Sequence, residues 1–188
     1  MPTDALSLTL ALLAGIAVSA ACGLRAFLPL LALGIGARFF GLELQPVLRW
    51  LTGDLSLIAL GTATVVEIAG DKIPAVDHAL DVVATFVRPV TAAIATYGLL
   101  VHWPTPWAQI LAVLLGGSAL ALHAVKAKTR VGSSLLSFGL ANPLLSVVED
   151  IVSAGLVFIA FLAPLLMALV LLLVFVLLNR RRKAPLPT

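Results

Sequence analysis

Long apolar stretches separated by short polar ones dominate this chain, and the pattern predicts membrane-spanning helices. Residues 5–24 contain no charge, and residues 26–42 are apolar again after Arg25. A single rod through both stretches would be about 50 Å long, so we expect two helices that meet at Arg25. Residues 43–54 are more polar and include Trp50, and tryptophan is typical of a membrane interface.

Proline and glycine divide the remainder of the chain into further predicted segments. These are residues 55–69, 75–87, 88–101, 108–125, 131–141 and 144–178. Proline breaks or kinks a helix, so we expect Pro89 to open a new segment and Asn142-Pro143 to end one. The last stretch exceeds the roughly 20 residues that one span requires. We therefore expect a further break at Pro164.

The composition assigns the chain to a broad class. Of 188 residues, 61% are hydrophobic and only 11% are charged, with a mean hydropathy of +1.14, whereas soluble domains carry about 25% charged residues. At roughly 20 residues per helix, about five to seven membrane segments fit, some of them broken or re-entrant. The predicted fold is an all-α integral membrane protein, with residues 1–179 forming one compact helical bundle.

Basic residues provide the predicted topology. A third of the twelve Lys and Arg residues lie in Arg180–Lys183, and the positive-inside rule makes residues 180–188 a cytoplasmic tail. Binding of anionic lipid head groups is the alternative role for this tail. Lys126, Lys128 and Arg130 are expected to form a second cytoplasmic basic cluster. The net charge of +3 therefore does not indicate a nucleic-acid partner.

Charged residues inside the apolar sequence are the main clue to function. Charges at membrane depth are costly and usually mark a pathway or a bound polar ligand. They occur in two similar settings, each close to a proline that interrupts a helix. The candidate substrate- or ion-binding residues are Arg25, Glu67, Asp71, Lys72, Asp77, Arg130, Asn142, Glu149 and Asp150.

The spacing of these residues leaves three uses open. Glu67 and Asp71 are four residues apart and share a helical face. Their carboxylates can pair with Arg25, Arg88 or Arg130 as a structural lock. They can also carry a proton, because burial raises the pKa of a carboxylate, or bind a hard cation through oxygen. The arginines can neutralise the acids or grip a phosphate with two hydrogen bonds.

The chain also contains a weak internal repeat. When Arg25 is placed on Arg130, both are followed by a leucine pair, a glycine and then Val-Val-Glu, which ends at Glu67 and Glu149 respectively. The predicted repeat halves are residues 5–87 and 106–178. An odd number of crossings between the halves would make the repeat inverted, and many transporters have this architecture.

Signals for an enzyme are weak. The three histidines are scattered, whereas a zinc site needs several ligands at set spacings. The sequence has no nucleophile elbow, glycine-rich phosphate loop or HExxH motif. Cys22 is the only cysteine, so no internal disulfide can form. We assign no catalytic residue, metal or cofactor, and only Ser133, Ser134 and His78 remain as candidates for a lipid enzyme.

Three motifs together resemble a known family. They are Gly23-Leu-Arg-Ala-Phe-Leu-Pro29, the segment from Glu67 to Pro74 with Asp77, and Asn142-Pro143 followed by Glu149-Asp150. Over nearly its whole length the chain resembles a bacterial membrane-protein family, domain of unknown function 4126. The resemblance implies a multi-pass protein of the bacterial inner membrane. The turn from Arg25 to Pro29 is also similar to the DedA group of lipid translocases, as an analogy that assigns no residue roles.

Three hypotheses for function follow. The first is a small transporter or lipid-handling permease, in which Glu67, Asp71 and Glu149 face a proton or cation. In it, Arg25 and Arg130 bind an anionic head group or hold the acids. The second is a non-transporting scaffold whose charges lock helices together, and the third is a membrane-embedded lipid enzyme. The expected partners are the bilayer and an anionic lipid or small ion, and a homodimer is common among transporters of this size.

Overall fold

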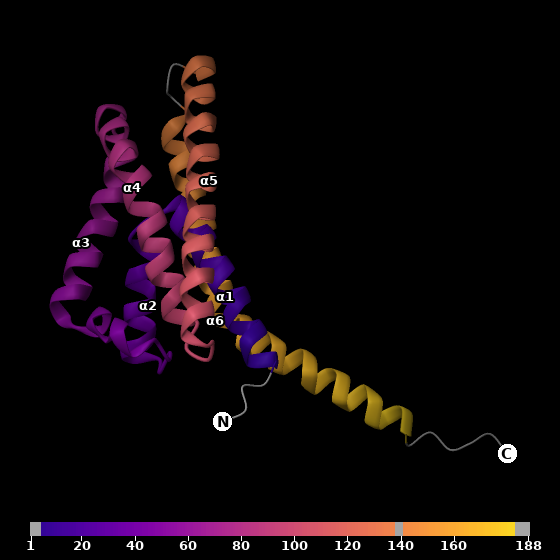
Figure 1. Cartoon of the computed structure of the whole chain (residues 1–188). Helices are drawn as coiled ribbons and strands as arrows, with labels where there is room; N and C mark the ends of the chain where they lie inside the picture. Colours follow the sequence, from indigo (N-terminus) through magenta and orange to yellow (C-terminus); the bar gives the residue numbers. More distant parts are fainter. Residues whose placement is uncertain (1–4, 138–140, 183–188) are drawn as a thin grey trace.

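Helices account for almost all of the chain that the structure describes. The computed structural model covers residues 5–137 and 141–182, and gives the backbone alone at 74–75, 77–79, 81, 134–136 and 163–182. No β-strand occurs in these ranges. The elements are α1 (Ala5–Leu24), α2 (Leu28–Phe39), the 3-10 helix η1 (Pro46–Thr52), α3 (Asp54–Gly70), α4 (Pro74–Leu99), α5 (Thr105–Ser137) and α6 (Asn142–Arg182), shown in Figure 1.

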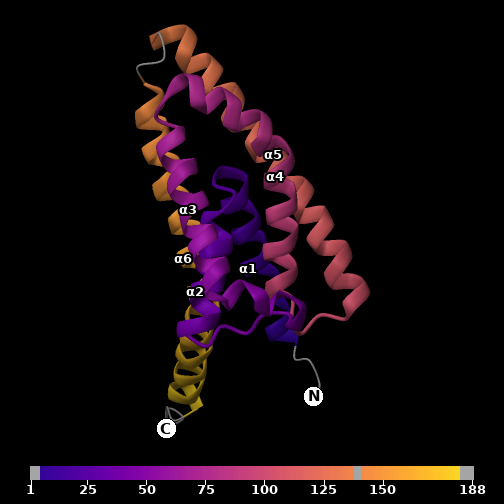
Figure 2. The same ribbon diagram turned by 90° about the vertical axis from the view of Figure 1, so that its left-hand side faces the viewer.

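Helix α1 forms the centre of the bundle. It packs against α4, α5 and α6, and α4 and α5 lie side by side in both views (Figures 1 and 2). Helices α2, η1 and α3 form a second group, joined to the first through α1, α4 and α6. The apolar core includes Val18, Leu33, Leu51, Ala92 and Ala95. The prediction of an all-helical bundle is therefore confirmed.

Four of the described helices contain a stretch long and apolar enough to cross a membrane. These stretches are Ala5–Leu24, Val82–Leu99, Thr105–Ser133 and Asn142–Leu162. A fifth crossing results if η1 and α3, which meet at an angle of 70°, count as one broken span. The protein is thus a multi-pass membrane protein, with four or five candidate spans in the described residues against the five to seven segments predicted.

The chain interruption at Arg25 is as the sequence predicts. Helix α1 ends at Leu24, and α2 begins at Leu28 with Pro29 in its first turn, where proline is well tolerated. The end of α1 packs closely against α5 at this interruption. A Cβ on Gly23 would lie only 2.8 Å from the Cβ of Leu122. Only glycine permits this approach without displacing α5.

Two predicted breaks are wrong. Pro89 lies inside the continuous helix α4, and Pro164 lies inside α6, which runs for 41 residues without interruption. In membrane helices, neighbouring groups can satisfy the backbone that a proline leaves unpaired, so proline alone does not end a helix there. At 1.5 Å per residue α6 is about 60 Å long, and its C-terminal part extends away from the other helices (Figure 1).

Two predictions about domain organisation stay predictions. The repeat halves 5–87 and 106–178 place their matched arginines differently, since Arg25 follows the end of a helix and Arg130 lies inside α5. Residues 180–182 form the last turn of α6. The rest of the proposed basic tail, 183–188, lies outside the described residues.

Candidate functional site

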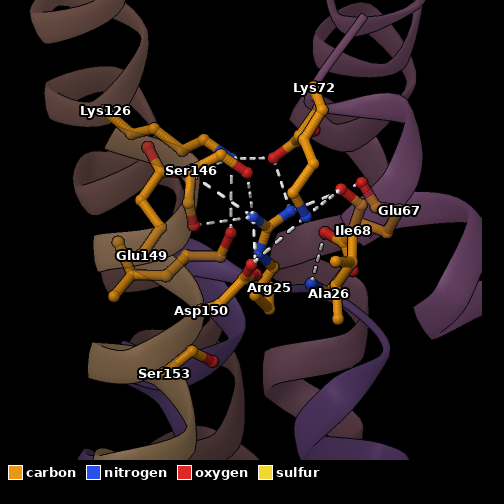
Figure 3. A network of polar contacts seen from close by, with 12 residues as sticks. Arg25, Ala26, Glu67, Ile68, Lys72, Lys126, Ser146, Glu149, Asp150 and Ser153 are labelled. Atoms are coloured by element: carbon orange, nitrogen blue, oxygen red, sulfur yellow. Dashed lines mark hydrogen bonds and ion pairs between the residues drawn. The ribbon is translucent and has the colours of Figure 1, made fainter. Parts of the chain in front are cut away.

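Arg25 lies at the centre of a group of buried charges. Its position in the three-residue break between α1 and α2 brings its side chain, which is fully buried, between α3 and α6. One terminal nitrogen, Nη1, donates to Asp71, and Nη2 lies 2.7 Å from Oδ1 of Asp150. Nη2 also donates to the hydroxyl of Ser146 at 2.9 Å. Figure 3 shows Arg25 with Glu149 and Asp150 on one side and Glu67 and Lys72 on the other.

Three cationic side chains contact a single carboxylate oxygen of Asp71. It directly follows α3, in the turn that leads to α4, and is buried. Its Oδ2 atom contacts Arg25 and lies 3.0 Å from Nζ of Lys126 and 3.0 Å from Nη2 of Arg130. Lys126 and Arg130 are one helical turn apart on α5, and both are buried. Asp71 therefore links α3 to both the α1–α2 break and α5.

Glu149 on α6 is the second acid that pairs with Lys126 and Arg130 of α5. Arg130 donates to it with Nη2 at 2.8 Å and Nε at 3.3 Å, which is a two-point contact between guanidinium and carboxylate. Lys126 lies 3.0 Å from the same carboxylate. Lys72 lies at the edge of the group, 3.8 Å from Asp150, with 41% of its side chain exposed.

Glu67 has a different set of partners from Asp71, although both lie near the end of α3. Its carboxylate accepts hydrogen bonds from the backbone N–H groups of Ala26 at 2.9 Å and Phe27 at 3.3 Å. These groups precede α2 and have no carbonyl partner within that helix. Arg88 of α4 lies 3.6 Å from the same carboxylate. Glu67 thus fixes the start of α2 to α3 and α4.

Arg88 connects this network to α1 and α5. Its Nη1 donates to the carbonyl of Gly23 at 3.2 Å and contacts Nδ1 of His123. On the other side of the ring, Nε2 of His123 lies 3.2 Å from the hydroxyl of Thr85. Because arginine only donates, Nδ1 of His123 accepts in this arrangement.

We call eight interacting charged residues the charge cluster, of which six are buried and two, Glu149 and Asp150, are partly exposed. It consists of Arg25, Glu67, Asp71, Arg88, Lys126, Arg130, Glu149 and Asp150. Four cations and four acids give it a formal charge of zero. Buried charges are tolerated when they are paired and hydrogen-bonded, and here the pairs cross between helices. The cluster can therefore hold helices together or exchange one of its own charges for that of a ligand.

An apolar pocket of about 430 Å³ adjoins the cluster between α3 and α4. Its walls include Ala59, Ala63, Val66, Leu80, Val83 and Val87. Glu67, Asp71 and Arg88 also line it. Small-molecule sites commonly combine such apolar walls with a few polar groups that fix orientation. This pocket joins a hydrophobic surface to the charge cluster.

Most of the predicted site residues meet in the cluster. The structure brings together Arg25, Glu67, Asp71, Arg130, Glu149 and Asp150, with Lys72 at the edge. Asn142 is buried at the first residue of α6, one turn before Ser146. The side chain of Asp77 lies outside the described residues. So do those of His78 and Ser134, two of the candidates for a lipid enzyme.

Three members of the network were absent from the predicted site. Lys126 was expected in a cytoplasmic basic cluster with Lys128 and Arg130. In the structure Lys126 and Arg130 are buried and face acids, while Lys128 is exposed. The four-residue spacing of Lys126 and Arg130 was the signal, because it puts both on one helical face. Ser146 carries no sequence signal beyond its spacing from Asp150, and Arg88 was considered only as an ion-pair partner.

No group of three or more His, Cys, Asp or Glu side chains in the described part of the chain is placed to hold a metal ion. The acids of the cluster instead face guanidinium and ammonium groups. Such donors are the groups with which proteins bind carboxylates and phosphates. The cations of the cluster are therefore donors of the kind that suits an oxyanion.

Comparisons with known proteins place the chain in one family. Residues 12–183 match the sequence model of a family described as Domain of unknown function (DUF4126). No curated protein and no solved structure matches the chain, and the likeness to the DedA translocases finds no support in these comparisons. With a match that covers nearly the whole helical bundle and every member of the charge cluster, the chain belongs to the DUF4126 family.

Proposed function

We propose that this protein is a small lipid-handling permease. A membrane amphiphile binds with its polar head at the charge cluster and its chain in the pocket between α3 and α4. The observation that carries this proposal is the contact between the two, since Glu67, Asp71 and Arg88 belong to the cluster and also line the apolar pocket. A site that joins charged groups to an apolar pocket suits a molecule with a charged head and an apolar chain.

The depth of the cluster supports a lipid substrate. Helix α1 has 20 residues and is about 30 Å long, which equals the thickness of the hydrocarbon core of a bilayer. Arg25 directly follows this helix, whereas Arg88 and Glu149 lie several residues inside the apolar stretches Val82–Leu99 and Asn142–Leu162. We therefore propose that the cluster lies toward one end of the spans, where a lipid head group would reach it from that side.

Within this proposal, the contacts of the acids control access to the site. Displacement of Asp71 or Glu149 from Lys126 and Arg130 would remove the attraction between opposite charges that joins α3 and α6 to α5. The helices that these contacts join could then separate on the side of the pocket. Arg25 would act mainly as the group that holds Asp71 and Asp150 in place.

Lipid flux in reconstituted vesicles tests the proposal. Purified protein in liposomes that contain a fluorescent phosphatidylglycerol should move the probe between leaflets, as measured by its quenching with external dithionite. Glu67→Gln and Asp71→Asn should each reduce this rate at least tenfold. Asp54→Asn is the matched control, since Asp54 also pairs with an arginine but is exposed.

The outcome that contradicts the proposal is equally direct. If both variants fold and move the probe at the wild-type rate, the acids have no part in transport. If the wild-type protein moves no probe above the rate of empty liposomes, the permease role for phosphatidylglycerol is wrong.

A second function, a non-transporting scaffold, is favoured by one observation. Every acid of the charge cluster lies within 4 Å of a cation on another element, so the cluster could serve only to join helices. In that case Glu67→Gln lowers thermal stability, and Arg88→Gln in the same chain partly restores it without any effect on lipid movement. Loss of flux with unchanged stability would rule this role out.

A further inference from the structure

We infer that the carboxylate of Asp71 occupies the binding position of a monoanionic lipid head group. When Asp71 withdraws, Arg25, Lys126 and Arg130 bind the head group in its place. This inference rests on the proposed function and names the chemical class of its substrate.

The geometry around one oxygen atom is the first support. Nη1 of Arg25, Nζ of Lys126 and Nη2 of Arg130 all approach Oδ2 of Asp71. The three cations come from the α1–α2 break and from α5, so a single acid on a third element fills the position that they define. Three charged donors around one oxygen form the kind of site in which proteins hold phosphate or carboxylate oxygens.

The charge balance around Arg25, Lys126 and Arg130 points to a ligand with one negative charge. Lys72, which lies 3.8 Å from Asp150, is left out of this count because 41% of its side chain is exposed and solvent screens it. Arg25, Lys126 and Arg130 carry three positive charges, and the acids paired with them are Asp71, Glu149 and Asp150. With Asp71 withdrawn, three cations face two acids, and one positive charge is unmatched. Because an unpaired buried charge is costly, the site then requires one negative charge, which a phosphodiester or a fatty-acid carboxylate supplies.

The position of Asp71 makes exchange feasible. Asp71 lies in a short turn between α3 and α4, whereas Arg130 and Lys126 are held within α5. Asp71 also lines the apolar pocket, so a head group that replaces it remains connected to a chain between α3 and α4. In addition, Nε of Arg25 is buried without a hydrogen-bond partner among the described residues, which leaves one more donor in the same guanidinium.

Binding measurements on Asp71→Asn test this inference. The variant and the wild type, in dodecyl maltoside micelles, are titrated with phosphatidylglycerol, oleate, phosphatidylcholine and inorganic phosphate. If Asp71 occupies the site in nine molecules out of ten or more, its neutralisation raises the apparent affinity for a monoanionic amphiphile about tenfold or more. We expect no such gain for zwitterionic phosphatidylcholine. The relative gains for phosphatidylglycerol and oleate distinguish the phosphodiester from the carboxylate.

Glu149→Gln is the matched control. It also removes one acid that contacts Lys126 and Arg130, but Glu149 is not among the residues that line the pocket. A gain confined to Asp71→Asn supports the inference. An equal gain in both variants would show only that surplus positive charge attracts anions, and would overturn it, as would equal binding of phosphatidylglycerol and phosphatidylcholine to Asp71→Asn.

Folding of the variant provides a second readout. If Asp71→Asn is unstable alone, it is purified with phosphatidylglycerol or with phosphatidylcholine. Recovery of monodisperse protein with the first lipid only supports the inference, because a ligand that binds the folded state stabilises it. Recovery with neither or with both contradicts it.

The flux assay separates this inference from the proposed function. Tight anion binding by Asp71→Asn without lipid movement in the wild type leaves the head-group site standing and removes the permease. Lipid movement in the wild type without anion selectivity in Asp71→Asn supports the permease and contradicts the head-group site at Asp71.

Discussion

Two arginine–aspartate pairs in this protein have the same contact and different surroundings. Arg25 contacts Asp71 through Nη1, and Arg38 contacts Asp54 through Nη1 as well. The side chains of the first pair are 0% and 2% exposed, and those of the second are 36% and 80% exposed. The first pair also shares partners with α5 and α6, whereas Arg38 has one further bond, to the carbonyl of Thr52.

The difference shows that the surroundings, and not the contact, decide what an ion pair does. An exposed pair exchanges water for a contact of similar strength, and typically contributes about 0–1 kcal/mol. A buried pair has lost its water, so the removal of one partner leaves a charge that nothing else can satisfy. We therefore expect the two pairs to respond very differently to the same substitution.

The largest expected effect is that of Arg25→Gln. This variant leaves Asp71 and Asp150 without one of their cations inside the bundle, and should lower the free energy of unfolding by about 3–5 kcal/mol. Denaturant unfolding in detergent, followed by the fluorescence of the tryptophans, measures the loss. A loss below about 1 kcal/mol would mean that the cluster is hydrated and would remove the contrast with Arg38.

Gly23→Leu should have the next largest effect. A Cβ at this position meets Leu122 at 2.8 Å and the carbonyl of Ala119 at 2.9 Å, so the added side chain pushes α1 away from α5. Overpacking of this kind costs about 3 kcal/mol at the upper end of its usual range. Gly117→Leu is the control on α5, because its Cβ would meet nothing within 4 Å. Equal melting temperatures for the two variants would contradict the close packing.

Ser146→Ala should have a moderate effect. The hydroxyl of Ser146 accepts a hydrogen bond from the charged Arg25 at 2.9 Å, and the loss of such a bond costs about 1.5 kcal/mol or somewhat more. Thr129→Ala is the control, because Thr129 is exposed and its hydroxyl bonds to a carbonyl of its own helix. Thermal unfolding of both variants in the same detergent would show whether the buried bond matters more.

Arg38→Gln should have the smallest effect. The free energy of unfolding should fall by less than about 1 kcal/mol, and the difference from wild type should shrink further as salt screens the exposed pair. The effect of Arg25→Gln should change little over the same range of salt. A large, salt-independent loss in Arg38→Gln would show that the second pair is shielded as well.

Local sequence was sufficient for several parts of the fold. Residues 5–24 form α1 as expected, because an uncharged apolar run of this length satisfies its backbone in the membrane only as a helix. The break at Arg25 followed from a charge and a proline close together. The predictions at Pro89 and Pro164 were wrong because each helix continues through its proline. At Pro89 the helix packs closely against Gly116 of α5, a contact that local sequence does not show.

The candidate site was partly visible in the sequence. Arg25, Glu67 and Asp71 were noticeable because charges are rare in so apolar a chain. Lys126 was assigned only to a cytoplasmic basic cluster, because its contact with Asp71 depends on how α3 and α5 pack, which the sequence does not show. Ser146 is an ordinary serine until the fold brings it to Arg25.

The sequence by itself determined that this protein lies in a membrane, approximately how many helices it has, and which charged residues needed partners inside the protein. These properties follow from the free energy of transfer of each side chain from water to lipid, which depends on residue type. Only the tertiary structure decided that three cations would surround one oxygen of Asp71 and that an apolar pocket would adjoin it. Both features depend on the relative placement of helices that are far apart along the chain, and the packing that sets this placement is a property of all of them together.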